Sequence, residues 1–155
     1  MFMNSMELKV PPPLVGLLVA AAMYGIAWAV PPFPFATAIK AAAAVVLALA
    51  GGAIDVAGLF AFRSAKTTIN PLKPQNASSL VSGGIYRYTR NPMYLGMLFF
   101  LVAWAVYLAQ PVALLGPMAF VLYITRFQII PEERVLAGLF GGEFAAYKAR
   151  VRRWL

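Results

Sequence analysis

The chain of 155 residues contains no cysteine and no histidine, and only five of its residues are acidic. Without cysteine it can form neither a disulfide framework nor a thiolate nucleophile. Without histidine it lacks the commonest metal ligand and the side chain that most often serves as a general base near neutral pH. These absences argue against a zinc enzyme and against a Ser-His-Asp hydrolase, and we expect no metal site.

Charged residues are scarce as a class. They make up 12% of the chain, whereas a soluble domain carries roughly 25%. Hydrophobic residues make up 62%, and the mean hydropathy is +0.77. A soluble protein of this size needs more polar surface, and a disordered chain needs low hydrophobicity. The composition therefore indicates a single integral membrane domain over residues 1–155, in contact with a lipid bilayer.

Four stretches are long and apolar enough to cross a bilayer as helices, which takes about 20 residues. We predict an all-α fold whose four transmembrane helices cover about residues 14–30, 36–62, 92–109 and 111–130. Pro92 and Pro111 stand at helix starts, where the missing N–H group has no consequence. Because the link at Gln110 is so short, the last two helices should form an antiparallel hairpin.

The basic residues indicate the orientation. Thirteen Lys and Arg residues against five Asp and Glu give a net charge of +8. Five of the basic residues lie between the second and third predicted helices and five follow the fourth. On an apolar chain this charge suits an anionic membrane face rather than nucleic acid. By the positive-inside rule both termini and the central loop are cytoplasmic, and we expect a bacterial inner-membrane protein.

The last segment, residues 131–155, has a different pattern. Pro131 is expected to start a helix, and Gly141-Gly142 to break it. After the break, four apolar residues at three- and four-residue spacing share one helix face: Phe144, Tyr147, Val151 and Trp154. We predict an amphipathic helix that lies along the cytoplasmic membrane face as a cap.

The segment from Ser82 to Gly96 combines glycines, tyrosines, arginines and an Asn-Pro pair directly before the third predicted helix. It is either a basic loop with interfacial tyrosines or a ligand site. In a ligand site, the N–H groups of the helix start, the Asn91 amide and the arginines would meet an anionic or polar group. Gly96 would allow close approach of a ligand or of a neighbouring helix.

Glu132 and Glu133 form a second polar segment. They either stabilise a helix N-terminus through its dipole or hold a cationic or hydroxyl-bearing ligand. Because the predicted hairpin begins and ends on the same side of the membrane, it brings these glutamates near the segment from Arg90 to Gly96.

Asp55 is an acidic residue inside the second predicted helix. Placing an acid within a membrane costs roughly 2.5–3.5 kcal/mol, which makes it a functional candidate. The alternative is a structural hydrogen bond to another helix or to Arg63. The nearby Gly51-Gly52 pair predicts close packing between helices.

Two motifs in a fixed order resemble the isoprenylcysteine carboxyl methyltransferase and phospholipid methyltransferase superfamily. The first is Tyr86-Arg87-Tyr88-Thr89-Arg90-Asn91-Pro92-Met93-Tyr94-Leu95-Gly96. The second follows a hydrophobic hairpin and consists of Pro131-Glu132-Glu133, then Phe140-Gly141, Tyr147 and Val151-Arg152-Arg153. The resemblance covers about residues 65–155. It implies S-adenosylmethionine as the methyl donor, bound at the cytoplasmic ends of the last two transmembrane helices.

The resemblance also implies roles for single residues. It assigns seven residues to the cofactor site: Arg90, Asn91, Pro92, Tyr94, Gly96, Glu132 and Glu133. Glu133 and Arg90 are the candidate catalytic residues. Tyr147 and Arg153, at matching C-terminal positions, are candidate substrate contacts, and Asp55 joins them because of its place in a membrane helix and not through the resemblance. Asn91 stands where the prenylcysteine enzymes have histidine. An asparagine amide forms hydrogen bonds but cannot act as a base at neutral pH.

The expected reaction is methyl transfer to a lipophilic acceptor, either an isoprenylcysteine-like carboxylate or a lipid amine. A carboxylate acceptor needs no base, whereas an amine must first lose a proton to Glu133, Glu132, Asp55 or water. Two alternatives are a small four-helix transporter that couples through Asp55 and a family relative without catalysis.

Overall fold

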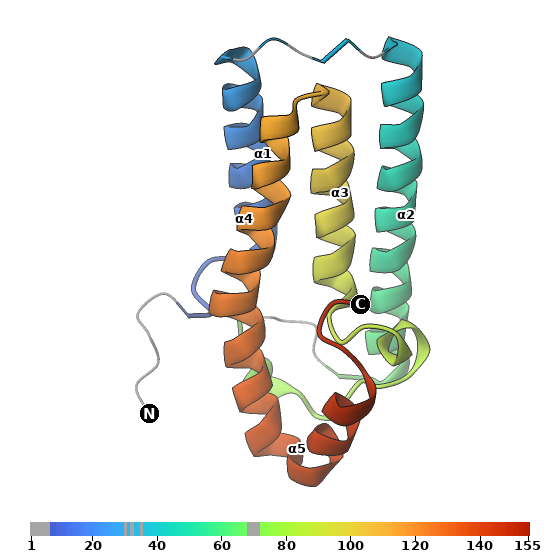
Figure 1. The fold of residues 1–155 in the computed structure, drawn as a ribbon. Helices are drawn as coiled ribbons and strands as arrows, with labels where there is room; N and C mark the ends of the chain where they lie inside the picture. The colour runs from blue at the N-terminus through green and yellow to red at the C-terminus, as the bar shows by residue number, and fades with distance from the viewer. Residues whose placement is uncertain (1–6, 30, 32, 35, 68–71) are drawn as a thin grey trace.

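The computed structural model describes residues 7–29, 31, 33–34, 36–67 and 72–155, and the regular elements within these ranges are all helical. Four apolar helices stand side by side as a bundle: α1 (Pro12–Ala29), α2 (Thr37–Ser64), α3 (Pro92–Leu108) and α4 (Leu115–Ile124) (Figure 1). Three short 3₁₀ turns lie in the connections: η1 (Pro74–Asn76), η2 (Gly84–Arg87) and η3 (Pro111–Leu114). The π turn η4 (Thr125–Ile129) leads from α4 into α5 (Ile130–Arg150). The predicted all-α fold is confirmed.

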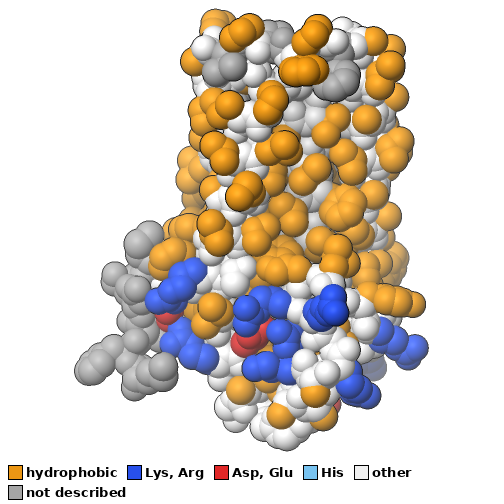
Figure 2. Space-filling model, viewed as in Figure 1, with side chains coloured by type: hydrophobic (Ala, Val, Ile, Leu, Met, Phe, Trp, Pro, Cys, Tyr) orange, Lys and Arg blue, Asp and Glu red, His pale blue; other side chains and the backbone are white. Residues whose placement is uncertain are grey.

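Among the described residues, three helical stretches are long and apolar enough to cross a membrane: α1, α2 and the run from Pro111 to Arg150. The fourth apolar helix, α3, has 17 residues and stands between α2 and α4 (Figure 1). A helix of that length rises about 26 Å, close to the thickness of a bilayer's hydrocarbon core. Hydrophobic side chains cover the upper part of the bundle, and lysines and arginines gather around its lower end (Figure 2). The chain is therefore an integral membrane protein.

The predicted hairpin of the last two membrane helices is confirmed. Helix α3 ends at Leu108, and the next residue, Ala109, has a left-handed backbone conformation with φ +51°. Pro111 then begins η3, so the chain reverses within a few residues and α4 packs beside α3. The hairpin brings the start of α3 and the end of α4 to the same end of the bundle (Figure 1).

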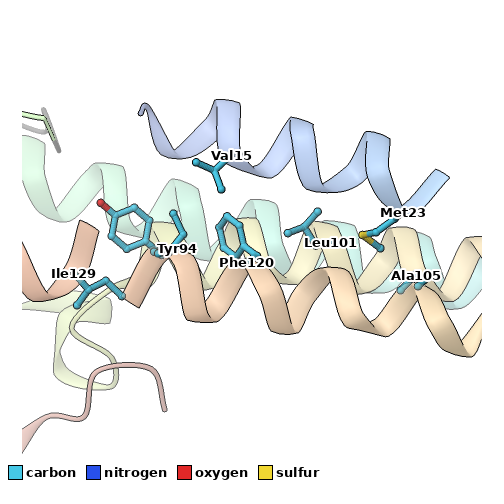
Figure 3. Close-up of a cluster of buried hydrophobic side chains, with 9 residues drawn as sticks. Val15, Met23, Tyr94, Leu101, Ala105, Phe120 and Ile129 are labelled. Atoms are coloured by element: carbon cyan, nitrogen blue, oxygen red, sulfur yellow. The ribbon is translucent and has the colours of Figure 1, made fainter. Parts of the chain in front are cut away.

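The main core lies between α1, α3 and α4 (Figure 3). Its nine buried residues are Val15, Met23, Tyr94, Leu101, Ala105, Ala113, Phe120, Ile124 and Ile129. Phe120 and Ile124 have no exposed surface at all. Tyr94 stands at the end of this core near Ile129, and its hydroxyl points out of the apolar cluster (Figure 3). The core therefore holds the ring of Tyr94 while leaving its polar group free for another contact.

Glycines bring α2 and α3 into close contact. A Cβ atom added at Gly51 would lie 2.9 Å from the Gly96 carbonyl oxygen and 3.0 Å from Phe99 Cβ. A Cβ atom added at Gly96 would meet the Gly51 carbonyl oxygen at 2.9 Å and the Asp55 carboxylate closer still. The close packing predicted at Gly51 is confirmed. Of the two partners expected for Gly96, the neighbouring helix is the one observed.

Helix α5 begins within one residue of the predicted start at Pro131, but it is not a separate helix. It continues α4 through η4. A proline cannot donate to the carbonyl four residues earlier, which here belongs to Phe127. That carbonyl instead accepts a hydrogen bond of 3.1 Å from the Leu8 N–H group. The predicted break is confirmed, because Gly141 has φ +47° and the helix reverses there (Figure 1).

The helix after Gly141 has the predicted apolar face, but this face lies against the protein and not along a membrane. The predicted face extends further than the helix: α5 ends at Arg150, so Val151 and Trp154 follow it, and Trp154 packs against the main core. Phe144, Tyr147 and Val151 are only 3%, 4% and 9% exposed. They form a second core with residues of α2, of the loop between α2 and α3, and of the first part of α5: Ala61, Phe62, Leu80, Val81, Ile85, Tyr86, Leu136 and Phe140. The expectation of a membrane-bound cap is thereby corrected, because the apolar face is already covered.

Candidate functional site

A cavity of about 460 Å³ lies at the charged end of the bundle. This volume is within the usual range for small-molecule sites. Its walls come from the starts of α1, α3 and α5, from the loop at residues 72–81 and from the helix after Gly141. Most of the lining is apolar, and the polar groups come mainly from the two motifs at Arg90–Tyr94 and Glu132–Glu133.

The start of α3 is held by the C-terminal residues. The Arg90 N–H group donates to the Arg152 carbonyl at 3.0 Å. The side-chain amide of Asn91 donates to the Arg153 carbonyl at 2.8 Å. The Thr89 hydroxyl accepts the Asn91 N–H group at 3.2 Å, and Pro92 then begins the helix. The C-terminal tail therefore fixes the direction in which this motif enters the cavity.

Glu133 is the centre of an ion-pair network. One Nη atom of Arg90 lies 2.9 Å from its Oε1 atom. Arg153 donates to both carboxylate oxygens, from Nε at 3.1 Å and from Nη2 at 2.8 Å. The side chains of Glu133 and Arg90 are only 12% and 11% exposed. Because both are largely buried, each needs the other to offset its lost hydration.

Glu132 has a different environment from its neighbour. The Tyr94 hydroxyl donates a hydrogen bond to its carboxylate. Burial raises the pKa of Glu132 to about 8, although the Tyr94 hydrogen bond lowers it, and the adjacent Glu133 charge raises it further. In the ligand-free protein Glu132 is therefore mostly protonated at pH 7 and can take up or release a proton near neutral pH.

Two tyrosines close another part of the cavity. The Tyr147 hydroxyl donates to the Tyr86 carbonyl at 2.8 Å, and the Tyr86 ring meets Phe62 of α2 edge to face at 5.5 Å. Burial raises the pKa of both phenols above their ordinary value, so both stay neutral. They provide aromatic surface and a fixed connection between the central loop and α5.

Six of the predicted site residues line the cavity: Arg90, Asn91, Tyr94, Glu132, Glu133 and Tyr147. The other four lie beside it. Arg153 reaches Glu133 from the C-terminal tail, and Pro92 packs where α3 passes Gly58 of α2. Gly96 and Asp55 face each other between α2 and α3. The Asp55 Oδ1 atom is buried and has no hydrogen-bond partner among the described residues.

The cavity also contains residues that the sequence did not single out. Tyr86 is part of the first motif, and its place there was the available signal. The three prolines Pro11–Pro13 also line the cavity, and nothing in their local sequence indicated it. They come from the opposite end of the chain to the motifs.

Comparison with known proteins places this arrangement in a family. The model of the phospholipid methyltransferase family matches residues 39–143. A protein of Haemophilus influenzae that is described as uncharacterized is 48% identical over 63 residues, which cover all of that protein and 41% of this chain. No solved structure matches the chain.

Proposed function

Because the chain belongs to the phospholipid methyltransferase family, we propose that it transfers a methyl group from S-adenosylmethionine to a lipophilic acceptor. One observation carries the proposal: both motifs of the resemblance line a single cavity, although about 40 residues separate them along the chain. We treat residues 1–155 as one methyltransferase domain.

The polar groups of the cavity suit S-adenosylmethionine, which carries an ammonium group, a carboxylate, ribose hydroxyls and an adenine ring. The Arg90 Nε atom is buried without a hydrogen-bond partner among the described residues, and it can donate to a carboxylate or hydroxyl oxygen. Glu132 can accept from the ammonium group or from a ribose hydroxyl. When bound, the cofactor supplies a methyl group activated by a sulfonium. Asn91 and Glu133 keep Arg90 and the C-terminal tail in place.

The apolar walls suit a lipophilic acceptor. Pro12 of α1, Met93 and Met97 of α3, and Ile129 at the end of η4 line the same cavity as the polar motifs. These residues come from the helices that cross the membrane. An acceptor with an apolar tail can bury that tail against them while its polar end meets the motifs. Alignment of acceptor and methyl group is then the main catalytic requirement, and positioning alone can contribute as much as about 7–11 kcal/mol.

The two glutamates have separate roles in this proposal. Both oxygens of Glu133 are engaged by arginines, so Glu133 organises the site and is poorly placed to accept a proton. Glu132 has a pKa of about 8 in the free protein, and the positive charge of the bound cofactor leaves it ionised and able to accept a proton. For a lipid amine we therefore propose Glu132 as the proton acceptor, with Tyr94 orienting its carboxylate.

Charge indicates the side of the membrane on which this reaction takes place. The basic residues gather at the end of the bundle that holds the cavity (Figure 2). By the positive-inside rule we propose that this end, with both termini, is cytoplasmic in a bacterial inner membrane.

The direct test is calorimetric titration of the detergent-purified protein with S-adenosylmethionine and with its demethylated product. A methyl-transfer assay with radiolabelled cofactor on a membrane lipid extract then identifies the acceptor. We expect binding of both ligands and a labelled lipid. Absence of binding would reject the proposal, and binding without any labelled product would favour a relative that has no catalysis.

The affinity for S-adenosylmethionine should rise between pH 6 and pH 8. Below its pKa of about 8 the free protein holds a proton on Glu132, and a cationic ligand favours the ionised carboxylate, so binding releases that proton. Kd should fall by up to about tenfold per pH unit and level off above pH 8. Calorimetry in two buffers of different ionisation enthalpy measures the released proton directly.

The matched variant for this titration is Glu132→Gln, which cannot titrate. Its Kd should be independent of pH over the same range, whereas Glu143→Gln, at an exposed glutamate of the same helix, should keep the wild-type profile. A flat profile in the wild-type protein would contradict the assignment of Glu132.

A further inference from the structure

The N-terminal residues 7–10 are hydrogen-bonded to the π turn η4. The Leu8 N–H group donates to the Phe127 carbonyl at 3.1 Å, and the Gln128 side chain donates to the Val10 carbonyl at 2.7 Å. Gln128 has no exposed surface. These bonds join segments that lie more than 110 residues apart in the sequence.

The backbone of η4 provides the acceptor for this contact, the Phe127 carbonyl. Pro131 has no N–H group to give to Phe127, the residue four positions earlier. The Leu8 N–H group donates to this carbonyl, where a proline four residues further on cannot. The N-terminal segment therefore binds at a carbonyl that Pro131 leaves without its usual α-helical donor.

Glu7 strengthens the attachment by charge. It is 3% exposed and pairs with two arginines, Arg126 within η4 at 2.8 Å and Arg134 within α5. These two arginines lie on either side of Pro131, Glu132 and Glu133 along the helix. A single buried carboxylate thus joins the residues before and after the glutamate pair.

The same N-terminal segment reaches the cavity. It runs directly into Pro11–Pro13, which form part of the cavity wall. The family match begins at residue 39, so it assigns no role to this segment. Because prolines have a fixed φ, the wall they form is set by where residues 7–10 are attached.

We propose that residues 7–13 form a strap that closes one side of the cavity, and that Glu7 is a positioning residue for Glu132 and Glu133. The cavity wall depends only on the contacts above, whereas the catalytic consequence rests on the proposed function. A π turn contains one more residue than an α-helical turn, and each residue turns the helix by about 100°. The π turn therefore sets the rotational position of the two glutamates, and releasing Glu7 from Arg126 and Arg134 leaves that position unfixed.

The absence of cysteine from the chain allows a test that needs no cofactor. A Met97→Cys reporter places one thiol on the cavity wall, and a Gly138→Cys reporter places one on the open surface of α5. The rate of maleimide labelling is measured for each reporter, alone and combined with Glu7→Gln. The matched control is Lys9→Gln, which removes an exposed charge from the same segment.

We expect Glu7→Gln to speed labelling of the Met97→Cys reporter at least fivefold, with no change at the Gly138→Cys reporter and no effect of Lys9→Gln. Arg126→Gln should act in the same direction, and because the Arg126 side chain is 49% exposed this variant poses little risk to folding. Unchanged labelling in both Glu7→Gln and Arg126→Gln would overturn the strap. An equal increase at both reporters would also overturn it, because the loosening would not be confined to the cavity.

The positioning role is tested by cofactor affinity. Glu7→Gln should raise the Kd for S-adenosylmethionine at least fivefold at unchanged helix content, whereas Lys9→Gln should leave it unchanged. If Glu7→Gln speeds labelling of the Met97→Cys reporter but leaves the Kd unaltered, the strap still forms a cavity wall, and the positioning role of Glu7 is overturned. If the wild-type protein binds no S-adenosylmethionine, the proposed function fails, and the labelling rates still decide whether the strap closes the cavity.

Discussion

Replacing Glu133 by glutamine is expected to lower methyl transfer and the affinity for S-adenosylmethionine by more than 100-fold. The carboxylate is the shared partner of Arg90 and Arg153, and the Arg90 side chain is 11% exposed. Removing one partner of a buried ion pair leaves the other charge uncompensated, at a cost of about 3–5 kcal/mol. With its partner gone, Arg90 is expected to leave its present position on the cavity wall.

The measurements are the calorimetric Kd and the rate of methyl transfer, with circular dichroism as a check on helix content. Glu143→Gln is the matched control, because it makes the same change at an exposed site of α5, and it should be within twofold of wild type. A Glu133→Gln variant that kept a third or more of wild-type activity would show that the ion-pair network is not needed for the site.

Replacing Gly96 by alanine is expected to destabilise the bundle by about 3 kcal/mol, at the upper end of the usual cost of overpacking. The added methyl group would lie 2.9 Å from the Gly51 carbonyl oxygen and closer to the Asp55 carboxylate. The Gly51 contact is backbone, so no side-chain rotation can relieve it. Helices α2 and α3 would have to separate along their interface, which is next to the Arg90–Tyr94 segment of the cavity wall.

Thermal unfolding in detergent, followed by circular dichroism, measures this loss. Gly52→Ala is the matched control, because the nearest atom to its added Cβ is Phe100 Cζ at 3.9 Å, and it should not lower the melting temperature. Combining Gly96→Ala with Asp55→Ala removes one of the two clashes and should restore part of the stability. A Gly96→Ala variant as stable as wild type would contradict the observed packing of α2 on α3.

Local sequence was sufficient for the first three membrane helices, whereas the fourth, expected at 111–130, is divided into η3, α4 and η4 and continues into α5. The first and second were predicted at 14–30 and 36–62, and the structure places them at Pro12–Ala29 and Thr37–Ser64. Hydropathy predicts such helices well because each apolar residue contributes to membrane insertion independently of its distant neighbours. The same locality explains the hairpin, where Pro111 restarts the helix directly after α3 ends.

Periodicity predicted which residues share a face, but not what that face contacts. Phe144 and Tyr147 do lie on one side of their helix, as their spacing indicated, and a membrane surface was the expected partner. The structure pairs that side with Tyr86 and Phe62 instead. An apolar helix face can be covered by lipid or by protein. Which of the two covers it depends on where the reversal at Gly141 directs the helix.

Hydropathy, proline placement and chain length are enough to predict a helical membrane protein, its hairpin and two polar motifs at one end of that hairpin. The groups that complete the site could be identified only from the packing of the helices. Arg153 closes on Glu133 across 20 positions and Arg134 on Glu7 across 127. Such contacts depend on the relative placement of whole helices, which no local pattern encodes.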